Sequence, residues 1–182
     1  MFSKNQLGFL YMFISVCAFS VMDLIVKWSV NYPVGEVLFF RGFCGIIPLL
    51  FLIPKKKYFN FYKTNKPFLH FKRCLAGLIA IVSIFIALRK LPLATVTSIS
   101  FAAPIFTTIL SIFLLSEKVG FYRWLAVLIG FIGILIISEP GFNSANIYYV
   151  YPIIFCLGLS YVAISIKQLS STEPVWLISF YF

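Results

Sequence analysis

The chain has 182 residues, of which 62% are hydrophobic and 11% are charged, and its formal net charge is +10. Soluble domains carry roughly 25% charged residues, so this composition excludes an ordinary soluble domain and indicates that lipid surrounds most of the side chains. The basic residues lie mostly in short segments between apolar runs, without a nucleic-acid-binding motif, so we expect no nucleic-acid partner.

Six apolar runs predict six membrane-spanning helices, followed by the start of a seventh. The expected ranges are Leu7–Trp28, Val34–Ile53, Phe68–Leu88, Leu93–Leu115, Phe121–Ile137 and Ile147–Ile166, and the seventh helix begins at Pro174. The third helix has a clean apolar run too short to span a bilayer, so we extend it back to Phe68. Lys72 and Arg73 would then reach along the helix to the membrane surface. The predicted fold class is therefore an all-α, polytopic membrane protein.

Charge distribution predicts how these helices are oriented. Most of the 15 Lys and Arg residues fall in segments on the same side of the membrane as the N-terminus, with a cluster between the second and third helices. Because cytoplasmic loops carry an excess of Lys and Arg, we expect a cytoplasmic N-terminus.

An internal repeat appears about 140 residues apart. The sequence S-V-M-D-L-I-V-K from Ser20 aligns with S-Y-V-A-I-S-I-K from Ser160. The aligned pairs are Ser20 with Ser160, Lys27 with Lys167, Pro33 with Pro174 and Phe40 with Tyr181. The copies lie in the first and the sixth predicted helices, an offset of five membrane crossings, so the second enters from the opposite side, as in secondary transporters with inverted repeats. We expect a first repeat over residues 1–140 and the start of a second over 141–182, with most of that second repeat missing from the chain.

Five small or polar residues follow one face of the predicted fourth helix, namely Thr97, Ser100, Pro104, Thr107 and Ser111. Their spacing of three and four residues aligns them on one stripe, whereas the opposite positions are bulky and apolar. One interpretation is a packing face, because small residues let membrane helices approach closely. The other is a cavity wall, with Pro104 freeing a backbone carbonyl for substrate or water. The two interpretations are compatible.

Charged residues within the first two predicted helices are candidates for function, since ionisable groups inside a membrane usually face a cavity or a partner. Asp23 and Lys27 lie one helical turn apart, so they can form an ion pair at the membrane boundary or line a substrate path. Arg41 lies between apolar turns and can pair with Glu36 or Asp23, reach outward, or bind a substrate carboxylate. Among the acidic residues, Asp23 is the one candidate to couple transport to protons or sodium, and facilitated exchange without a coupling ion is an equally open alternative.

Signatures of an enzyme or a metal centre are missing from the sequence. It contains no nucleophile motif, no zinc-protease motif and no phosphate-binding glycine loop, and its four cysteines are scattered through apolar runs. His70, the only histidine, lies near Lys72 and Arg73 at a predicted membrane boundary, where we expect it to face water or lipid. We expect no enzymatic activity, catalytic residue, metal or cofactor.

Four short segments together resemble the EamA repeat of the drug/metabolite transporter superfamily. They are A-L-R-K-L-P-L-A over 87–94, S-F-A-A-P-I-F over 100–106, L-S-E-K over 115–118 and G-F-I-G over 130–133. The resemblance implies ten helices in two inverted five-helix repeats, alternating access for a small metabolite, and a central cavity lined by helices one to four and six to nine. The fifth helix, with Ala126, Gly130 and Gly133, would be a packing element outside the cavity. Asp23 to Lys27 followed by Arg41 also resembles the branch that holds S-adenosylmethionine uptake carriers.

Together these observations predict a secondary-type transporter that moves a small organic metabolite across a bacterial inner membrane, with the lipid bilayer as its surroundings. The expected substrate path is lined by Asp23, Lys27, Arg41, Thr97, Ser100, Pro104, Thr107 and Ser111. The alternative is a truncated half-carrier that forms a homodimer, or a membrane interaction protein that transports nothing. Substrate, direction and coupling ion are left open.

Overall fold

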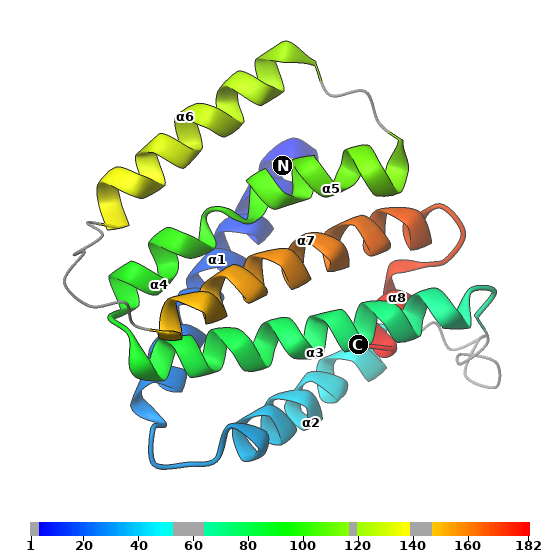
Figure 1. Cartoon of the computed structure of the whole chain (residues 1–182). Coiled ribbons are helices and arrows are strands. Elements are labelled where there is room, and N and C mark those ends of the chain that lie inside the picture. Colours follow the sequence, from blue (N-terminus) through cyan, green and yellow to red (C-terminus); the bar gives the residue numbers. More distant parts are fainter. Residues whose placement is uncertain (1–3, 53–63, 117–119, 139–146) are drawn as a thin grey trace.

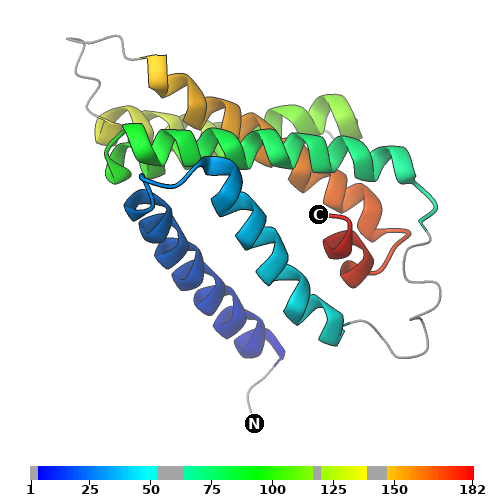
Figure 2. The ribbon, with the colours of Figure 1, turned by 90° about the horizontal axis from the view of Figure 1, so that it is seen from below.

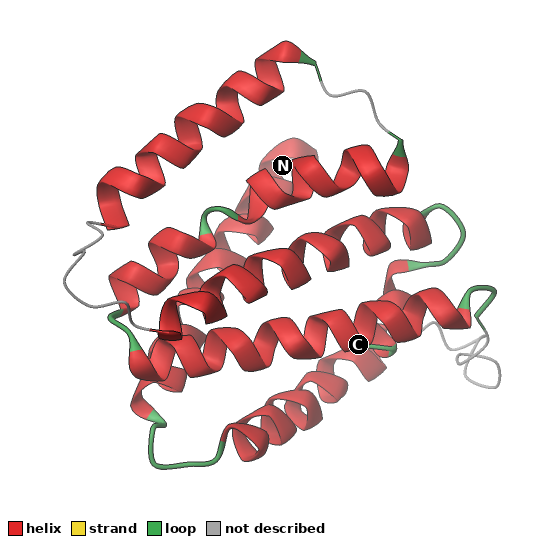
Figure 3. Ribbon diagram, in the orientation of Figure 1, coloured by secondary structure: helices red, strands yellow, loops and turns green. Residues whose placement is uncertain are grey.

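A computed structural model describes residues 4–52, 64–116, 120–138 and 147–182. The α-helices are α1 (Lys4–Trp28), α2 (Val34–Leu52), α3 (Pro67–Lys90), α4 (Leu93–Ser100), α5 (Ala103–Leu115), α6 (Phe121–Ser138), α7 (Val150–Ser170) and α8 (Val175–Phe180). A short 3-10 helix, η2 (Ile147–Tyr149), precedes α7. The described residues form helices and connecting loops without strands (Figure 3), which confirms the all-α prediction.

The helices form two groups. In Figure 1, α6, the α4–α5 pair, α7 and α3 lie side by side in one layer, with α6 at its outer edge. Figure 2 shows α1, α2 and α8 together on one side of that layer. This arrangement brings α8, from the end of the chain, into contact with α2 from its beginning.

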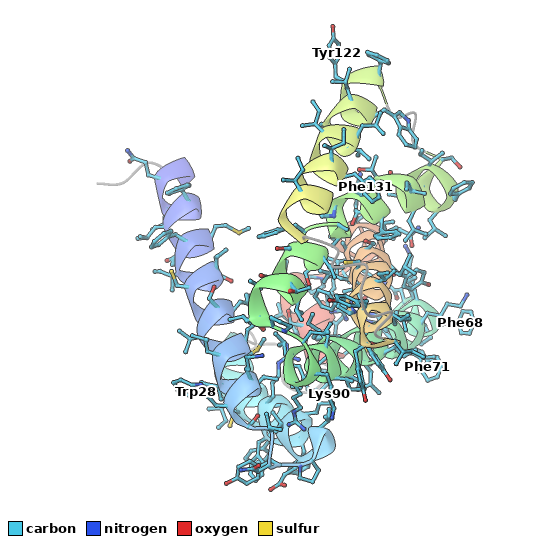
Figure 4. The ribbon with its side chains drawn as sticks, turned by 60° about the vertical axis from the view of Figure 1, so that its left-hand side comes forward. Trp28, Phe68, Phe71, Lys90, Tyr122 and Phe131 are labelled. Atoms are coloured by element: carbon cyan, nitrogen blue, oxygen red, sulfur yellow. The ribbon has the colours of Figure 1, made fainter. Side chains whose placement is uncertain are left out.

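Four segments of the described chain are long and apolar enough to cross a membrane, namely Gln6–Trp28, Pro67–Lys90, Leu93–Leu115 and Ile147–Ser170. The chain is therefore an integral, multi-pass membrane protein. Side chains such as Trp28, Phe68, Phe71 and Tyr122 point away from the bundle (Figure 4) and are at least 65% exposed. Large apolar side chains on the outside fit a protein whose outer solvent is lipid.

One predicted helix is interrupted. Residues 93–115 form α4 and α5, separated by a turn at Phe101 and Ala102, instead of one continuous helix. The cause is Pro104, which has no N–H to donate and whose ring clashes with the preceding turn, so a new helix starts with Pro104 in its first turn. Together the two halves are still long and apolar enough to cross a membrane as one segment.

Small residues hold the centre of the fold together. Helix α7 lies against α3 at Gly158, where an added Cβ would sit 2.8 Å from the Ala80 Cβ and 2.9 Å from the Ala76 carbonyl oxygen. Such close approach is how membrane helices gain packing energy without a hydrophobic driving force. A cluster of buried side chains, including Val26, Phe85 and Leu88, extends this contact to α1.

The packing face expected on α6 is not used within the described chain. A Cβ added at Gly130 or Gly133 would meet no described atom within 4 Å. The expectation that α6 lies at the edge agrees with Figure 1. Glu117 and Lys118, from the L-S-E-K segment of the resemblance, lie outside the described residues.

Candidate functional site

A cavity of about 490 Å³ lies between α2, α3 and α8. Arg41, Gly42 and Gly45 form its α2 wall, and the residues from the other two helices include Cys74, Leu78 and Tyr181. The two glycines leave open space, because a Cβ at either would meet no described atom within 4 Å. Cavities that hold small ligands typically measure about 300–1,000 Å³, so this one is large enough for a metabolite.

Arg41 is the charged residue that lines this cavity. Its side chain is half-buried, and within the described residues it has neither a hydrogen bond nor an ion pair. Asp23 on α1 attracts Arg41 through space without contacting it directly. A guanidinium presents a rigid fork of donors that matches a carboxylate, so Arg41 keeps its hydrogen-bonding capacity for a ligand.

Lys27 has a different environment from Arg41. Its ammonium group donates hydrogen bonds to the Leu88 and Leu91 carbonyl oxygens at 3.1 and 2.8 Å. These carbonyls lie at the C-terminal end of α3, where a cation is favourable. The expected ion pair between Lys27 and Asp23 does not form in the described structure, because α3 offers Lys27 better-placed acceptors. Arg89 adds a second link by donating to the Ser29 carbonyl oxygen at 2.9 Å.

The polar stripe of α4 and α5 follows the helix pair, but its members have different surroundings. The hydroxyls of Thr97 and Ser100 donate to carbonyl oxygens one turn back in their own helix. Thr107 lies 3.0 Å from the Ser160 hydroxyl on α7, and Ser111 is buried. Thr107 and Ser111 also border a second, smaller cavity of about 170 Å³ that includes Lys167.

The carbonyls near the Pro104 break are used by the protein itself. The Cys156 thiol on α7 lies 3.4 Å from the Ile99 carbonyl oxygen and 3.7 Å from that of Ser100. Ser160 donates to the Ala103 carbonyl oxygen at 2.9 Å. Donors from α7 therefore lie beside the carbonyls at this break, and the use of those carbonyls by substrate or water stays a prediction. Pro104 itself is exposed and lines neither cavity.

A buried polar cluster at the start of α3 was missed by the sequence analysis. His70 and Glu173 have side chains only 2% exposed, and the imidazole Nε2 lies 2.5 Å from the Glu173 Oε2. The Glu173 Oε1 accepts hydrogen bonds from the Thr64 hydroxyl and, at 3.0 Å, from the Asn65 N–H. The expectation that His70 faces water or lipid is wrong, because the turn between α7 and α8 covers it.

Glu173 lies outside the membrane-spanning segments, and its pKa is lowered from the ordinary value of 4.5. Burial acts in the opposite direction and would raise the pKa, but the hydrogen bonds from Thr64, His70 and the Asn65 N–H outweigh it by stabilising the carboxylate. Glu173 is therefore ionised at neutral pH, and three hydrogen-bond donors stabilise its negative charge.

Arg73 is also buried, at 3% exposure, so it does not extend to the membrane surface as expected. It donates to the Ile178 carbonyl oxygen at 2.9 Å, and its guanidinium lies 4.9 Å from the centre of the Phe182 ring. Next to it, the Cys74 thiol donates to the Tyr181 carbonyl oxygen at 2.7 Å. These contacts hold α8 against α3. They position Cys74, Tyr181 and Phe182, which line the cavity beside Arg41.

Neither cavity has the donor set of a metal centre. Across the part of the chain that the structure describes, no three His, Cys, Asp or Glu residues are grouped to hold a metal ion. The chemistry available beside Arg41 is therefore charge, hydrogen bonding and aromatic contact.

Comparisons with known proteins agree on one family. The family model described as "EamA-like transporter family" matches residues 6–139. The chain is 31% identical to the S-adenosylmethionine uptake transporter of Rickettsia prowazekii (strain Madrid E), over 96% of this chain and 59% of that protein. It is 34% identical to the transporter of the same name in Rickettsia bellii (strain RML369-C), over 80% of this chain and 51% of that protein.

A more distant relative is named for a different transport function. The pseudopaline exporter CntI of Pseudomonas aeruginosa (strain UCBPP-PA14) is 27% identical over 96% of this chain and 62% of its own length. The chain thus spans between about half and two thirds of the length of these curated relatives. No solved structure matches the chain.

Proposed function

We propose that this chain, which belongs to the EamA-like transporter family, moves a small carboxylate-bearing metabolite across a bacterial inner membrane, with the cavity beside Arg41 as its binding site. Family membership identifies it with transporters and not with enzymes. The observation that carries the proposal is Arg41, a cation within an apolar helix that lines a cavity and has no direct partner among the described residues. Leaving such a charge unpaired in a membrane is costly unless a ligand uses it.

The walls of the cavity favour an amino-acid-like substrate that also carries a flat ring. Arg41 would bind the carboxylate, and Phe180, Tyr181 and Phe182 provide aromatic surface on the α8 side. S-adenosylmethionine contains a carboxylate, a cationic sulfonium and an adenine ring, and it is the substrate named for the Rickettsia relatives. The negative charge of Asp23, close to Arg41, suits a ligand that also carries positive charge.

For the remaining path residues the contacts support more than one role. Lys27 would position α1 against α3, since both of its acceptors are carbonyls of the α3 C-terminal end. Thr107 and Ser111 would pack α5 on α7 and border the smaller cavity, while Thr97 and Ser100 would extend the polar face.

The proposed mechanism is alternating access between two inverted repeats, 1–140 and the start of a second at 141–182, with the N-terminus in the cytoplasm. Corresponding features support the repeat. Lys27 and Lys167 each lie in the last turn of their helices, α1 and α7. Pro33 and Pro174 each directly precede the next helix. A substrate site between the two repeats is typical of such carriers, and the Arg41 cavity lies between α2 of the first and α8 of the second.

A counterflow assay tests this function without assuming a coupling ion. The complete gene product is reconstituted into vesicles loaded with unlabelled S-adenosylmethionine, and transient entry of the labelled compound is measured. Arg41→Ala should lower transport efficiency about tenfold to hundredfold, the cost of a lost charge-assisted hydrogen-bond pair. The transport efficiency of Arg41→Lys should lie between those of the wild type and Arg41→Ala, because Lys keeps the charge but lacks the paired donors of a guanidinium.

The matched control is Lys72→Ala, which removes an exposed cation from α3 outside the cavity. Its counterflow should equal that of the wild type. Undiminished counterflow in Arg41→Ala would contradict the role of Arg41, and no counterflow in the wild type would contradict this substrate.

A further inference from the structure

The polar contacts at the start of α3 all join the two proposed repeats. Thr64, Asn65 and His70 belong to the first repeat, and Glu173 lies in the turn between α7 and α8 of the second. The Arg73 bond to the Ile178 carbonyl joins the same two parts. In the proposed orientation this is the cytoplasmic end of the bundle. If the repeats move against each other, opening this end must break the contacts of Glu173 and expose both members of the pair to water.

The protonation of the pair decides what charge this closed end buries. With a neutral imidazole, His70 and Glu173 together bury a net charge of −1, because the hydrogen bonds to Glu173 keep its carboxylate ionised. With one proton added to the imidazole, the pair becomes neutral overall. Burying a compensated ion pair costs much less free energy than burying an uncompensated charge.

The imidazole has an open position for that proton. Its Nε2 faces Glu173, while its Nδ1 is buried and has no hydrogen-bond partner among the described residues. Protonation of Nδ1 therefore breaks no existing bond and leaves the contact with Glu173 intact.

We propose that His70 and Glu173 form a proton-binding site, in which the cytoplasmic end of the carrier closes with one proton on the pair and releases it to water on opening. This inference rests on the proposed alternating access and adds the proton as the coupling ion. It places coupling at Glu173 rather than at Asp23, the acid favoured by the sequence.

Other titratable groups lie around the pair. Arg73 is one turn along α3, and its charge opposes an added proton, but its guanidinium is directed to the Ile178 carbonyl and the Phe182 ring. Tyr181 lies against the imidazole with ring centres 4.5 Å apart, and Cys74 bonds to the Tyr181 carbonyl. Two lysines also lie near His70 in the sequence. Lys66 directly precedes α3 and is half-buried, and Lys72 is exposed and lies over the Phe68 ring. Among the described residues, Glu173 is the carboxylate that contacts His70.

The test measures opening directly and needs no substrate. Cys74 is half-buried beneath α8, so opening at this end exposes it to a membrane-impermeant maleimide. The complete gene product, with Cys17, Cys44, Cys156 and any further cysteine replaced by Ala, is labelled in inside-out vesicles between pH 6.5 and 8.5. His70→Gln is the reference, because Gln keeps a donor toward Glu173 but takes up no proton. The ratio of the two rates cancels the pH dependence of thiol reactivity.

Release of one proton per opening event predicts that this ratio rises with pH, by at most about tenfold per pH unit. Glu173→Gln should flatten the rise as well, because the carboxylate that favours a protonated imidazole is gone. The proposal is overturned if wild type and His70→Gln share one pH profile, or if Glu173→Gln keeps the wild-type rise. If His70→Gln fails to insert, Glu173→Gln becomes the reference and the same slope decides.

The outcome is separable from that of the proposed function. A steep labelling ratio without S-adenosylmethionine counterflow would overturn the substrate and leave the proton site supported. Normal counterflow with a flat ratio would support the carrier and overturn the proton site.

Discussion

The contact of α7 with α3 at Gly158 permits a quantitative prediction. In Gly158→Ala the new Cβ would lie 2.8 Å from the Ala80 Cβ and 2.9 Å from the Ala76 carbonyl oxygen. Part of the obstacle is backbone, so relief requires the two helices to separate. Overpacking of this kind costs about 1–3 kcal/mol.

Gly130→Ala on α6 is the matched control, since its Cβ would meet no described atom within 4 Å. Both substitutions gain the same helix propensity, about 1 kcal/mol, which therefore cancels between them. The difference in unfolding free energy should equal the overpacking cost. For a protein of this size, each kcal/mol shifts the midpoint of thermal unfolding by about 2–4 °C.

Thermal unfolding of the purified complete protein in detergent, followed by a thiol-reactive dye that reports exposure of the buried Cys156, measures that difference. We expect Gly158→Ala to unfold about 2–12 °C below Gly130→Ala. Equal midpoints would refute the close α3–α7 contact on which the fold depends.

Three further predictions follow from single residues. Lys27→Met should lower the unfolding midpoint by about 4–10 °C, because it leaves the Leu88 and Leu91 carbonyls without their charged donor. Counterflow per folded molecule should stay unchanged. Lost counterflow at full stability would mean that Lys27 contacts substrate instead. Glu173 has a lowered pKa, so its stabilising effect is complete above pH 4.5 and is lost as the pH falls below that value. The wild type should therefore lose more stability than Glu173→Gln between pH 5 and 3. Parallel acid-unfolding profiles would contradict the hydrogen bonds to the carboxylate. Sedimentation of the detergent-solubilised complete protein should show a monomer if the cavity is formed within one chain, whereas a stable dimer would favour the half-carrier alternative.

The helices and their ends follow from local signals. Pro33 and Pro174 each precede an apolar run, and they predicted where α2 and α8 begin. The apolar composition of the chain indicated that lipid surrounds it. The interruption of the fourth predicted helix could have been predicted too, because Pro104 cannot continue the preceding helix and is favoured in the first turn of a new one.

The site could be predicted only in part. Arg41 was identifiable because a charged residue within an apolar membrane helix is costly and usually faces a cavity or a partner. Its surroundings were not, because Cys74 and Tyr181 come from helices far apart in the sequence. His70 and Glu173 illustrate the same limit, since 103 residues separate them and neither lies in a motif. In the sequence, each is only a polar residue near a predicted helix end, and the fold places the two together.

Substrate protection of Cys74 tests the central claim most directly, because this thiol lines the same cavity as Arg41. The complete protein, with its other described cysteines replaced by Ala, is labelled with maleimide at increasing S-adenosylmethionine concentrations. The account predicts that the ligand slows labelling of Cys74 with a saturable profile, and that Arg41→Ala shifts this profile to about tenfold or higher concentration. Labelling that is indifferent to the ligand while counterflow proceeds, or a profile unchanged by Arg41→Ala, would contradict it.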